Sequence, residues 1–433
     1  MTLVCAACDR SFGADARRPL PFRCDCPPGP QDRVLTPTPT LPAPGWRPAD
    51  DAQPFAAWRA LLTSHAEALA HGLGDAWFVD RVRALDAAVV SVDGAGFRQT
   101  PCAPLDLIEG AQVFAKDETG HVAGSHKARH LFGILLHLEV DEALGRRPPG
   151  GRLAIASCGN AALAAAVLAR ATKRSLTVFI PPDAHAAVVS RLEALGVEIE
   201  ICRRRAGEVG DPCYRRFLEA LDAGAVPFCC QGTANGLTLE GGKTLAWEMA
   251  RALDGRAIDH LVVQVGGGAL GSSLILGLRE AVALGLLPRM PSVHVVQTTG
   301  AAPLARAIDR VRARAEGSGL GRAGIGQALR HAAAHKADYM WPWEQPSQSL
   351  ATGILDDETH DWWRLCEGVL ETGGQSVIVT EATLIEARAR AHLVGVRASH
   401  TGAAGLAGAL SLCRDGVIPT GARIAVVLSG VER

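Results

Sequence analysis

A lysine at the expected start of a helix is the first residue whose type and position could do chemistry. Lys127 lies in the run GSHKARH, residues 124–130, and apolar residues with helical spacing follow it. The positive end of a helix dipole and partial burial both disfavour the charged ammonium form. A neutral amine readily forms a Schiff base. The alternative is a solvent-exposed lysine that only begins the helix.

A second segment could bind a carboxylate. The turn Ser157-Cys158-Gly159-Asn160 joins an apolar strand to an alanine-rich helix. Backbone N–H groups at such a helix start, together with the Ser157 hydroxyl, suit a carboxylate, and Asn160 offers an amide. The alternative is that Ser157 or Asn160 simply caps the helix.

A third segment could hold a phosphate group. Gly266, Gly267, Gly268 and Ala269 follow an apolar strand and lead into a helix, so their bare amides would form a phosphate cradle. The glycine spacing also fits G-x-G-x-x-G, which favours a nicotinamide dinucleotide. However, the next strand ends at Gln297 and lacks the acid that a dinucleotide site uses. A smaller monophosphate cofactor therefore fits better.

Two further sets of residues could bind a ligand or a metal. Ser429 follows the apolar run 424–428, and the carboxyl end of a buried strand faces the crevice where such sheets bind ligands; an ordinary turn is the alternative. Near the start of the chain, Cys5, Cys8, Cys24 and Cys26 form C-x2-C and C-x-C pairs. Four thiolates can close a tetrahedral structural zinc site, and incidental cysteines are the alternative.

Alternating strands and helices must position these groups. We expect buried strands at 153–156, 177–180, 198–202, 261–265, 293–297 and 424–428, with helices at 161–171, 184–195, 241–253 and 272–284. This alternation predicts an α/β fold with parallel-rich sheets covered by helices. A length of 433 residues predicts two or three domains.

Composition narrows the partners and the compartment. The formal net charge is −1, so the chain lacks the strong positive charge that would indicate a nucleic-acid partner. We find neither a secretory signal nor an apolar run long enough to cross a membrane. Twelve scattered cysteines are typical of reduced thiols, which predicts a cytoplasmic protein.

Together these segments resemble the pyridoxal-phosphate enzymes of the tryptophan synthase β fold, also called fold type II. The resemblance runs from about Thr100 to Gly430, with Thr100-Pro101, the lysine run, the SCGN turn, EGGKT, the triple glycine and the final Ser-Gly in family order. Within that fold the sequence is most similar to the threonine synthase and threonine dehydratase group. The cysteine-bearing leader, EGGKTLAWE, ATGILDDETHDWW and SHTGAAGLAG carry that likeness.

The resemblance implies a two-lobed architecture and a homodimer. The resemblance gives a large pyridoxal-phosphate-binding domain over 51–147 and 233–433 and a small mobile α/β domain over 148–232. The cysteine spacing suggests a zinc-ribbon-like leader over 1–26, and the proline density of 27–50 predicts a linker. Closure of the small domain on a substrate would exclude water from the site.

The resemblance also implies a role for each candidate residue. Lys127 would be the Schiff-base lysine of pyridoxal 5'-phosphate and the general base. Asn160 would bond the cofactor's O3′, and Gly266 to Ala269 would hold its phosphate. Ser157, Cys158, Gly159 and Asn160 would hold the substrate carboxylate, and Ser429 would meet the pyridine nitrogen.

The implied function is a threonine synthase-like lyase or synthase that works by β- or γ-elimination or replacement on an amino acid. A phosphorylated substrate would need cations, for which Lys116, Arg129, Lys243 and the histidines beside Lys127 are candidates. For Lys116 and Lys243 the alternative is a structural ion pair, with Glu118 and Glu240 respectively. Threonine synthases typically read G-S-F-K-D-R-G, and here His126, Ala128 and His130 differ. A serine or threonine dehydratase, a β-replacement synthase of specialised metabolism and a catalytically silent cofactor-binding protein therefore stay open.

Overall fold

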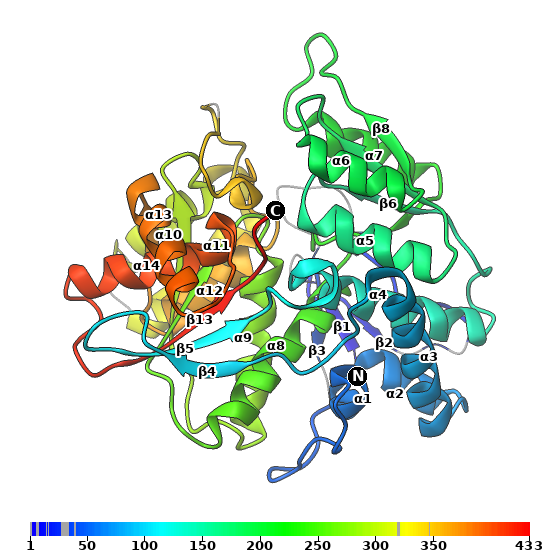
Figure 1. Cartoon of the computed structure of the whole chain (residues 1–433), viewed down its shortest axis with the longest axis horizontal. Helices are drawn as coiled ribbons and strands as arrows, with labels where there is room; N and C mark the ends of the chain where they lie inside the picture. The colour runs from blue at the N-terminus through cyan, green and yellow to red at the C-terminus, as the bar shows by residue number, and fades with distance from the viewer. Residues whose placement is uncertain are drawn as a thin grey trace.

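A computed structural model describes the chain except Met1, Ala6, Ala7, Ala14, Ala16, 27–33, Pro39, 318–320 and Pro346. Part of the predicted proline-rich linker, residues 27–33 and Pro39, thus lies outside the described residues. Figure 1 shows the described chain as two bodies of sheet and helix, with the N-terminal strands packed near their junction.

The larger body is built on a six-stranded sheet in the order β12-β11-β10-β13-β5-β4. Every pair in it is parallel except β4 with β5. Apolar residues cover both faces, as a parallel sheet requires. The strands are β4 Cys102–Leu105, β5 Gln112–Asp117, β10 His260–Gln264, β11 Ser292–Thr298, β12 Ser376–Val379 and β13 Arg423–Leu428.

Helices cover the two faces of this sheet with separate apolar cores. Val262 and Val426 pack with α13 Glu381–Leu393 and α14 His400–Arg414. Val263 and Val427, one residue further along each strand, pack with the opposite cluster, because successive side chains of a strand point to opposite faces. That second cluster includes α8 Thr238–Leu253, α9 Ala269–Ala283, α10 Pro303–Gly317, α11 Gly321–Ala334 and α12 Trp362–Glu371.

The smaller body is a four-stranded parallel sheet in the order β8-β7-β6-β9. Figure 1 shows it beside the larger body, in green. Its strands are β6 Leu153–Ala156, β7 Leu176–Ile180, β8 Glu198–Ile201 and β9 Val226–Pro227, and its helices are α5 Asn160–Ala171, α6 Ala186–Ala194 and α7 Pro212–Asp222. This sheet falls within the predicted small domain 148–232. The domain limits and the mobility of that domain stay predictions.

The first described residues form a three-stranded antiparallel sheet of β1 Thr2–Cys5, β2 Ser11–Gly13 and β3 Leu35–Thr38. The chain next to this sheet is anchored to the rest of the molecule by contacts that include Phe22. The Gly236 N–H donates to Phe22 O over 2.9 Å, and the guanidinium of Arg147 lies 4.3 Å from the centre of the Phe22 ring. The leader therefore packs against the segment that links the two bodies.

Four further helices connect the leader to the two bodies: α1 Pro54–Ala57, α2 Thr63–Ala70, α3 Asp75–Asp93 and α4 Lys127–Ala143. Short 3-10 helices cover Arg59–Leu61, Val122–Gly124, Lys336–Asp338 and Thr352–Ile354. Among the described residues, none of the helices has the length and apolar character needed to cross a membrane.

The predicted α/β alternation is confirmed, with element ends within about three residues of those expected. The strand β5, which holds Lys116, and the strand β4 that pairs with it were not predicted. The sequence of β5 is QVFAKD. Its last two residues are charged, which does not indicate a buried strand, although β5 lies inside the sheet.

Candidate active site

Lys127 begins α4, as predicted, and its side chain is partly exposed. The residues before it are fixed to the end of β13. Ser125 forms an antiparallel bridge with Gly430. The His126 backbone N–H and its ring Nδ1 both donate to Ser429 O, over 3.1 and 2.9 Å. The loop that carries the lysine is therefore held beside Ser429.

Ser429 directly follows β13 and is buried. Its hydroxyl oxygen accepts a hydrogen bond of 2.7 Å from Nε2 of Gln264, the last residue of the neighbouring strand β10. Gln264 also directs Nε2 at the carbonyl oxygens of Gly402 and Val427. Because the amide donates to the Ser429 oxygen, the hydroxyl hydrogen is left to donate to another acceptor.

The turn Ser157-Cys158-Gly159-Asn160 is accessible and begins α5. Among the described residues, no side chain caps α5, so neither Ser157 nor Asn160 has the capping role given as the alternative. Ser157 Oγ instead accepts from the Gly159 N–H over 3.4 Å. The uncapped helix start leaves backbone donors for a carboxylate.

Asn160 lies against the residues that flank Lys127. A side-chain carbon on Gly430 would be only 2.8 Å from Asn160 Nδ2, so this close approach needs glycine. Arg433 donates from Nε to Asn160 Oδ1 over 3.2 Å and from its terminal nitrogen to Ala123 O. Lys127, Asn160 and Ser429, which are far apart in sequence, are thus brought to one place.

The glycine loop 266–268 joins β10 to α9, as predicted. Gly268 has φ +102°, a left-handed conformation that favours glycine, and no side chain caps α9. Ser272, in the first turn of α9, has a buried hydroxyl without a hydrogen-bond partner among the described residues. Uncapped amides and an unpartnered hydroxyl are what an anion site supplies.

Two neutral histidines flank Lys127. Burial lowers the pKa of His126 well below its usual range, with Lys127 adding to the effect. Burial, again with Lys127, lowers the pKa of His130 to about 3. Nε2 of each ring is buried without a partner among the described residues. As neutral groups, they do not act as the cations that a phosphorylated substrate would need.

Lys116 and Arg129 were predicted to bind substrate, with a structural ion pair as the alternative for Lys116. The structure places both in structural ion pairs, and the partner of Lys116 is Glu248 rather than Glu118. Both side chains are fully buried. Lys116 Nζ lies 2.5 Å from Glu248 Oε2, while Arg129 pairs with Glu118 at 2.8 Å and with Glu248 at 2.6 Å. Although burial opposes it, the two glutamates raise the pKa of Arg129. The cations are neutralised inside the protein, out of reach of a substrate.

Lys243 has the structural role that the sequence analysis left as its alternative, but with a different partner. It is buried and pairs with Glu280 on α9 at 2.8 Å, not with Glu240. Glu240 instead lies 2.9 Å from the His137 ring.

Sequence reasoning missed Gln264 and Arg433. Gln264 had a signal, since a polar residue ends an otherwise apolar strand directly before the glycine loop. Arg433 had none, because its contact with Asn160 joins residues 273 positions apart.

The four leader cysteines come together. One sulfur from each of Cys5, Cys8, Cys24 and Cys26 lies within 4.8 Å of the others, and Cys8 Sγ is 3.7 Å from Cys24 Sγ. A tetrahedral zinc ion with Zn–S bonds of about 2.3 Å needs sulfurs roughly 3.8 Å apart. The donor set and its spacing therefore fit zinc.

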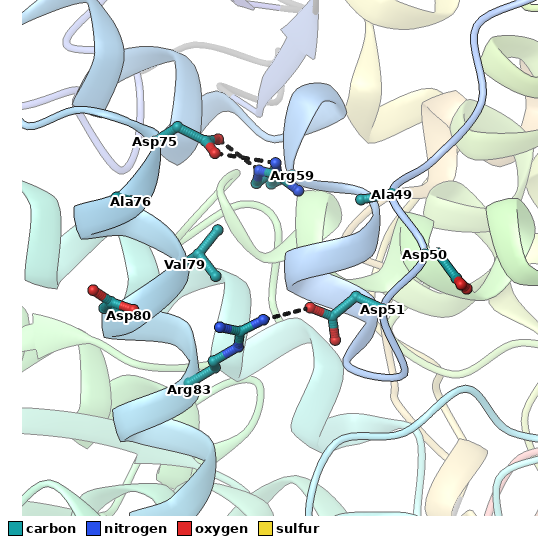
Figure 2. A pocket seen from close by; sticks show the side chains of 9 residues that line it. All are labelled: Ala49, Asp50, Asp51, Arg59, Asp75, Ala76, Val79, Asp80 and Arg83. Carbon is teal, nitrogen blue, oxygen red and sulfur yellow. Dashed lines mark hydrogen bonds and ion pairs between the residues drawn. The ribbon is translucent and has the colours of Figure 1, made fainter.

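Figure 2 shows a separate surface hollow of about 390 Å³ between the segment 49–59 and α3. Two of its arginines are paired with two of its aspartates: Arg59 with Asp75 at 2.6 Å, and Arg83 with Asp51 at 3.1 Å. None of the predicted site residues lines it.

Comparison with known proteins connects this geometry to a family. The model of the family described as "Pyridoxal-phosphate dependent enzyme" matches residues 94–430. Threonine synthase of Methanocaldococcus jannaschii is 23% identical over 350 residues, which cover 80% of this chain and 76% of that protein. A serine dehydratase-like protein of Mus musculus is 33% identical over 180 residues, which cover 41% of this chain and 50% of that protein.

Solved structures share the fold at low sequence identity. Maize serine racemase has a TM-score of 0.59 and 19% identity over 81% of this chain and 92% of its own. The processed form of threonine deaminase isoform 2 from Solanum lycopersicum has a TM-score of 0.56 and 17% identity over 82% of this chain and 90% of its own.

Proposed function

Because the chain belongs to the family of pyridoxal-phosphate dependent enzymes, we propose that it is a lyase or synthase acting on an amino acid, by elimination or replacement of a leaving group at Cβ or Cγ. Both kinds of enzyme are among its relatives, a threonine synthase and serine dehydratases. When bound, pyridoxal phosphate holds the amino acid covalently and withdraws electrons from its Cα.

The site residues fit this cofactor. The uncapped start of α9 and the buried, unpartnered Ser272 hydroxyl suit its phosphate, which Gly266, Gly267, Gly268 and Ala269 would hold through their amides. Lys127 would hold the cofactor through Nζ. Asn160 would donate to its O3′, since Arg433 occupies the amide oxygen and leaves Nδ2 as a donor.

The protein's own groups then have distinct tasks. Lys127, once released from the cofactor, would take the Cα proton as general base. The turn Ser157-Cys158-Gly159, with Asn160, would fix the substrate carboxylate. Closure of the segment 148–232 over the site would exclude water.

The observation that carries the proposal is a hydroxyl, and not an acid, at the end of β13. Gln264 donates to Ser429 Oγ, so Ser429 would donate its hydrogen to the pyridine nitrogen and leave that ring uncharged. An uncharged pyridine ring withdraws less electron density from Cα than a ring whose nitrogen is protonated by a carboxylic acid. This favours loss of a leaving group over transamination.

A cofactor assay followed by product analysis tests the proposal. The protein should bind pyridoxal phosphate with visible absorbance, borohydride should fix the cofactor to it by mass, and Lys127→Ala should abolish both. Phosphate release from phosphohomoserine would indicate γ-replacement, and ammonia with a 2-oxo acid from serine or threonine would indicate dehydration. Racemised amino acid as the only product would contradict the proposal.

We also propose that the four leader cysteines bind one structural zinc ion, because their sulfurs lie within 4.8 Å of one another, close enough for a shared tetrahedral ion. The leader lies far in sequence from the site but packs at Gly236, so the metal would support the link between the two bodies. Elemental analysis should find one zinc per chain. A homodimer in solution is a further expectation, which light scattering would test.

A further inference from the structure

A segment that the proposed function does not use lies across the glycine loop. In residues 351–361, Thr359 Oγ1 donates to Gly266 O over 3.0 Å, and the Asp361 N–H donates to Gly267 O over 3.2 Å. These bonds attach the segment to the loop at the end of β10.

Asp356 is the residue of this segment whose carboxylate meets the loop. A side-chain carbon on Gly266 would overlap Asp356 Oδ2, and one on Gly267 would lie 3.4 Å from Oδ1. The carboxylate therefore spans both glycines, and glycine at 266 is what admits it. Asp356 as a whole residue keeps some exposed surface.

Asp356 lies within the electrostatic reach of Lys127 and of the smaller body. Burial raises the pKa of Asp356 to about 6; Lys127 opposes that rise, while Asp357 and Asp211 add to it. Asp211 belongs to the smaller body, where it caps α7 by accepting from the Cys213 N–H over 2.8 Å. Near neutral pH, a fraction of Asp356 can therefore carry a proton.

Negative charge gathers on this side of the site. Burial raises the pKa of the Cys158 thiol in the SCGN turn, and Asp211, Asp183 and Asp356 add to that rise. The cations Lys116, Arg129 and Lys243 are meanwhile buried in ion pairs. A second phosphate, on the substrate, would meet carboxylates here and none of those three cations.

We propose that Asp356 is the acid that protonates the leaving group, and that the substrate is an amino acid whose leaving group is an unphosphorylated hydroxyl. This inference rests on the proposed function. Lys127 takes the Cα proton, the electron pair of that C–H bond forms the new double bond, and the C–O bond breaks. The Asp356 proton passes to the departing oxygen, which leaves as water. Hydroxide is a poor leaving group, so this proton is needed.

Two substrates that differ in their need for a proton test the assignment. Serine and threonine must lose a hydroxyl from Cβ, whereas β-chloroalanine loses chloride from Cβ, and chloride leaves without a proton. In cofactor-loaded Asp356→Asn, kcat/KM for the best hydroxy amino acid should fall by roughly 10²–10⁴-fold, the usual contribution of a general acid. The value for β-chloroalanine should stay within about threefold of the wild-type value, because no acid assists chloride.

Glu358→Gln is the matched control, because Glu358 is a nearby carboxylate of the same segment and pairs with Lys336 at 3.2 Å. This variant should change kcat/KM for both substrates by equal, small factors. An equal fall in kcat/KM for both substrates in Asp356→Asn, or no fall for either, would overturn the acid role. A wild-type preference for phosphoserine or phosphohomoserine over every hydroxy amino acid would overturn the substrate class. Failure of the wild type to bind the cofactor would instead defeat the proposed function itself.

Discussion

Arg433 Nε donates to Asn160 Oδ1 over 3.2 Å, which joins the chain after β13 to the first residue of α5. The same guanidinium donates to Ala123 O, four residues before Lys127. One side chain therefore contacts the smaller body, the larger body and the loop that carries the lysine. It also decides which end of the Asn160 amide points toward the proposed cofactor.

Loss of this contact should weaken cofactor binding. In Arg433→Leu, Asn160 can turn its oxygen toward O3′, so the affinity for pyridoxal phosphate should fall by roughly fivefold, the value of one hydrogen bond of about 1 kcal/mol. Titration of the apoprotein with cofactor, followed by absorbance, measures this. The control is Arg397→Leu, an exposed arginine 3.7 Å from Glu432, which should leave the affinity unchanged. An equal affinity in Arg433→Leu and wild type would remove Arg433 from the site.

Ser429→Asp should change which products are made. A carboxylate at this position would keep the pyridine nitrogen protonated and would increase electron withdrawal from Cα. We expect a smaller share of elimination product and a larger share of racemised or transaminated product from the same amino acid. Chiral chromatography and 2-oxo acid assays measure both. An unchanged product ratio would show that Ser429 does not set the protonation of the ring.

The buried ion cluster should be sensitive to loss of one carboxylate. Glu248 pairs with both Lys116 and Arg129, so Glu248→Gln leaves buried positive charge without compensation. We expect a loss of about 3–5 kcal/mol in the free energy of unfolding, measured with urea. Glu371→Gln removes a partly exposed partner of Arg279 and should cost under about 1 kcal/mol. Equal effects in the two variants would contradict the structural role of the cluster.

The local strand–loop–helix units could be predicted from the sequence, because glycines, apolar runs and helix starts are local signals. The juxtaposition of Lys127, Asn160 and Ser429 came from family order and is consistent with the structure. The shared partner of Lys116 and Arg129 could not be predicted, because Glu248 is more than a hundred positions away from both on α8. Asp356 was hidden for the same reason, since its contact with Gly266 is formed by the tertiary fold.

Metal removal should destabilise the leader. Cys24 is buried and lies 3.7 Å from Cys8, so Cys24→Ser would remove one of four ligands. We expect zinc content to fall below one per chain and proteolysis within the leader to increase, since the three-stranded sheet is too small to fold without a metal or other support. Cys413→Ser, far from the cluster, is the control. Full zinc content in Cys24→Ser would exclude the proposed ligand set.

Acid should destabilise the protein through His130. Its Nδ1 donates to Thr238 O over 2.9 Å, and burial, with Lys127, lowers its pKa to about 3, against roughly 6.5 in an unfolded chain. Between these values the unfolded chain binds a proton that the folded chain does not. The free energy of unfolding should therefore be constant above the unfolded pKa and should fall as the pH drops below it.

Urea unfolding over that pH window measures how steeply the free energy of unfolding changes with pH in the wild type, His130→Asn and His335→Asn. An asparagine at 130 can still donate to Thr238 but does not titrate, so this variant should lose some stability near neutral pH and show a shallower decline in acid. The exposed His335 should not alter the slope. An equal slope in His130→Asn and wild type would mean that His126 and His121, whose pKa values burial also lowers, account for the acid sensitivity. The low pKa of His130 also bears on function. A neutral imidazole beside Lys127 adds no second cation next to the proposed base.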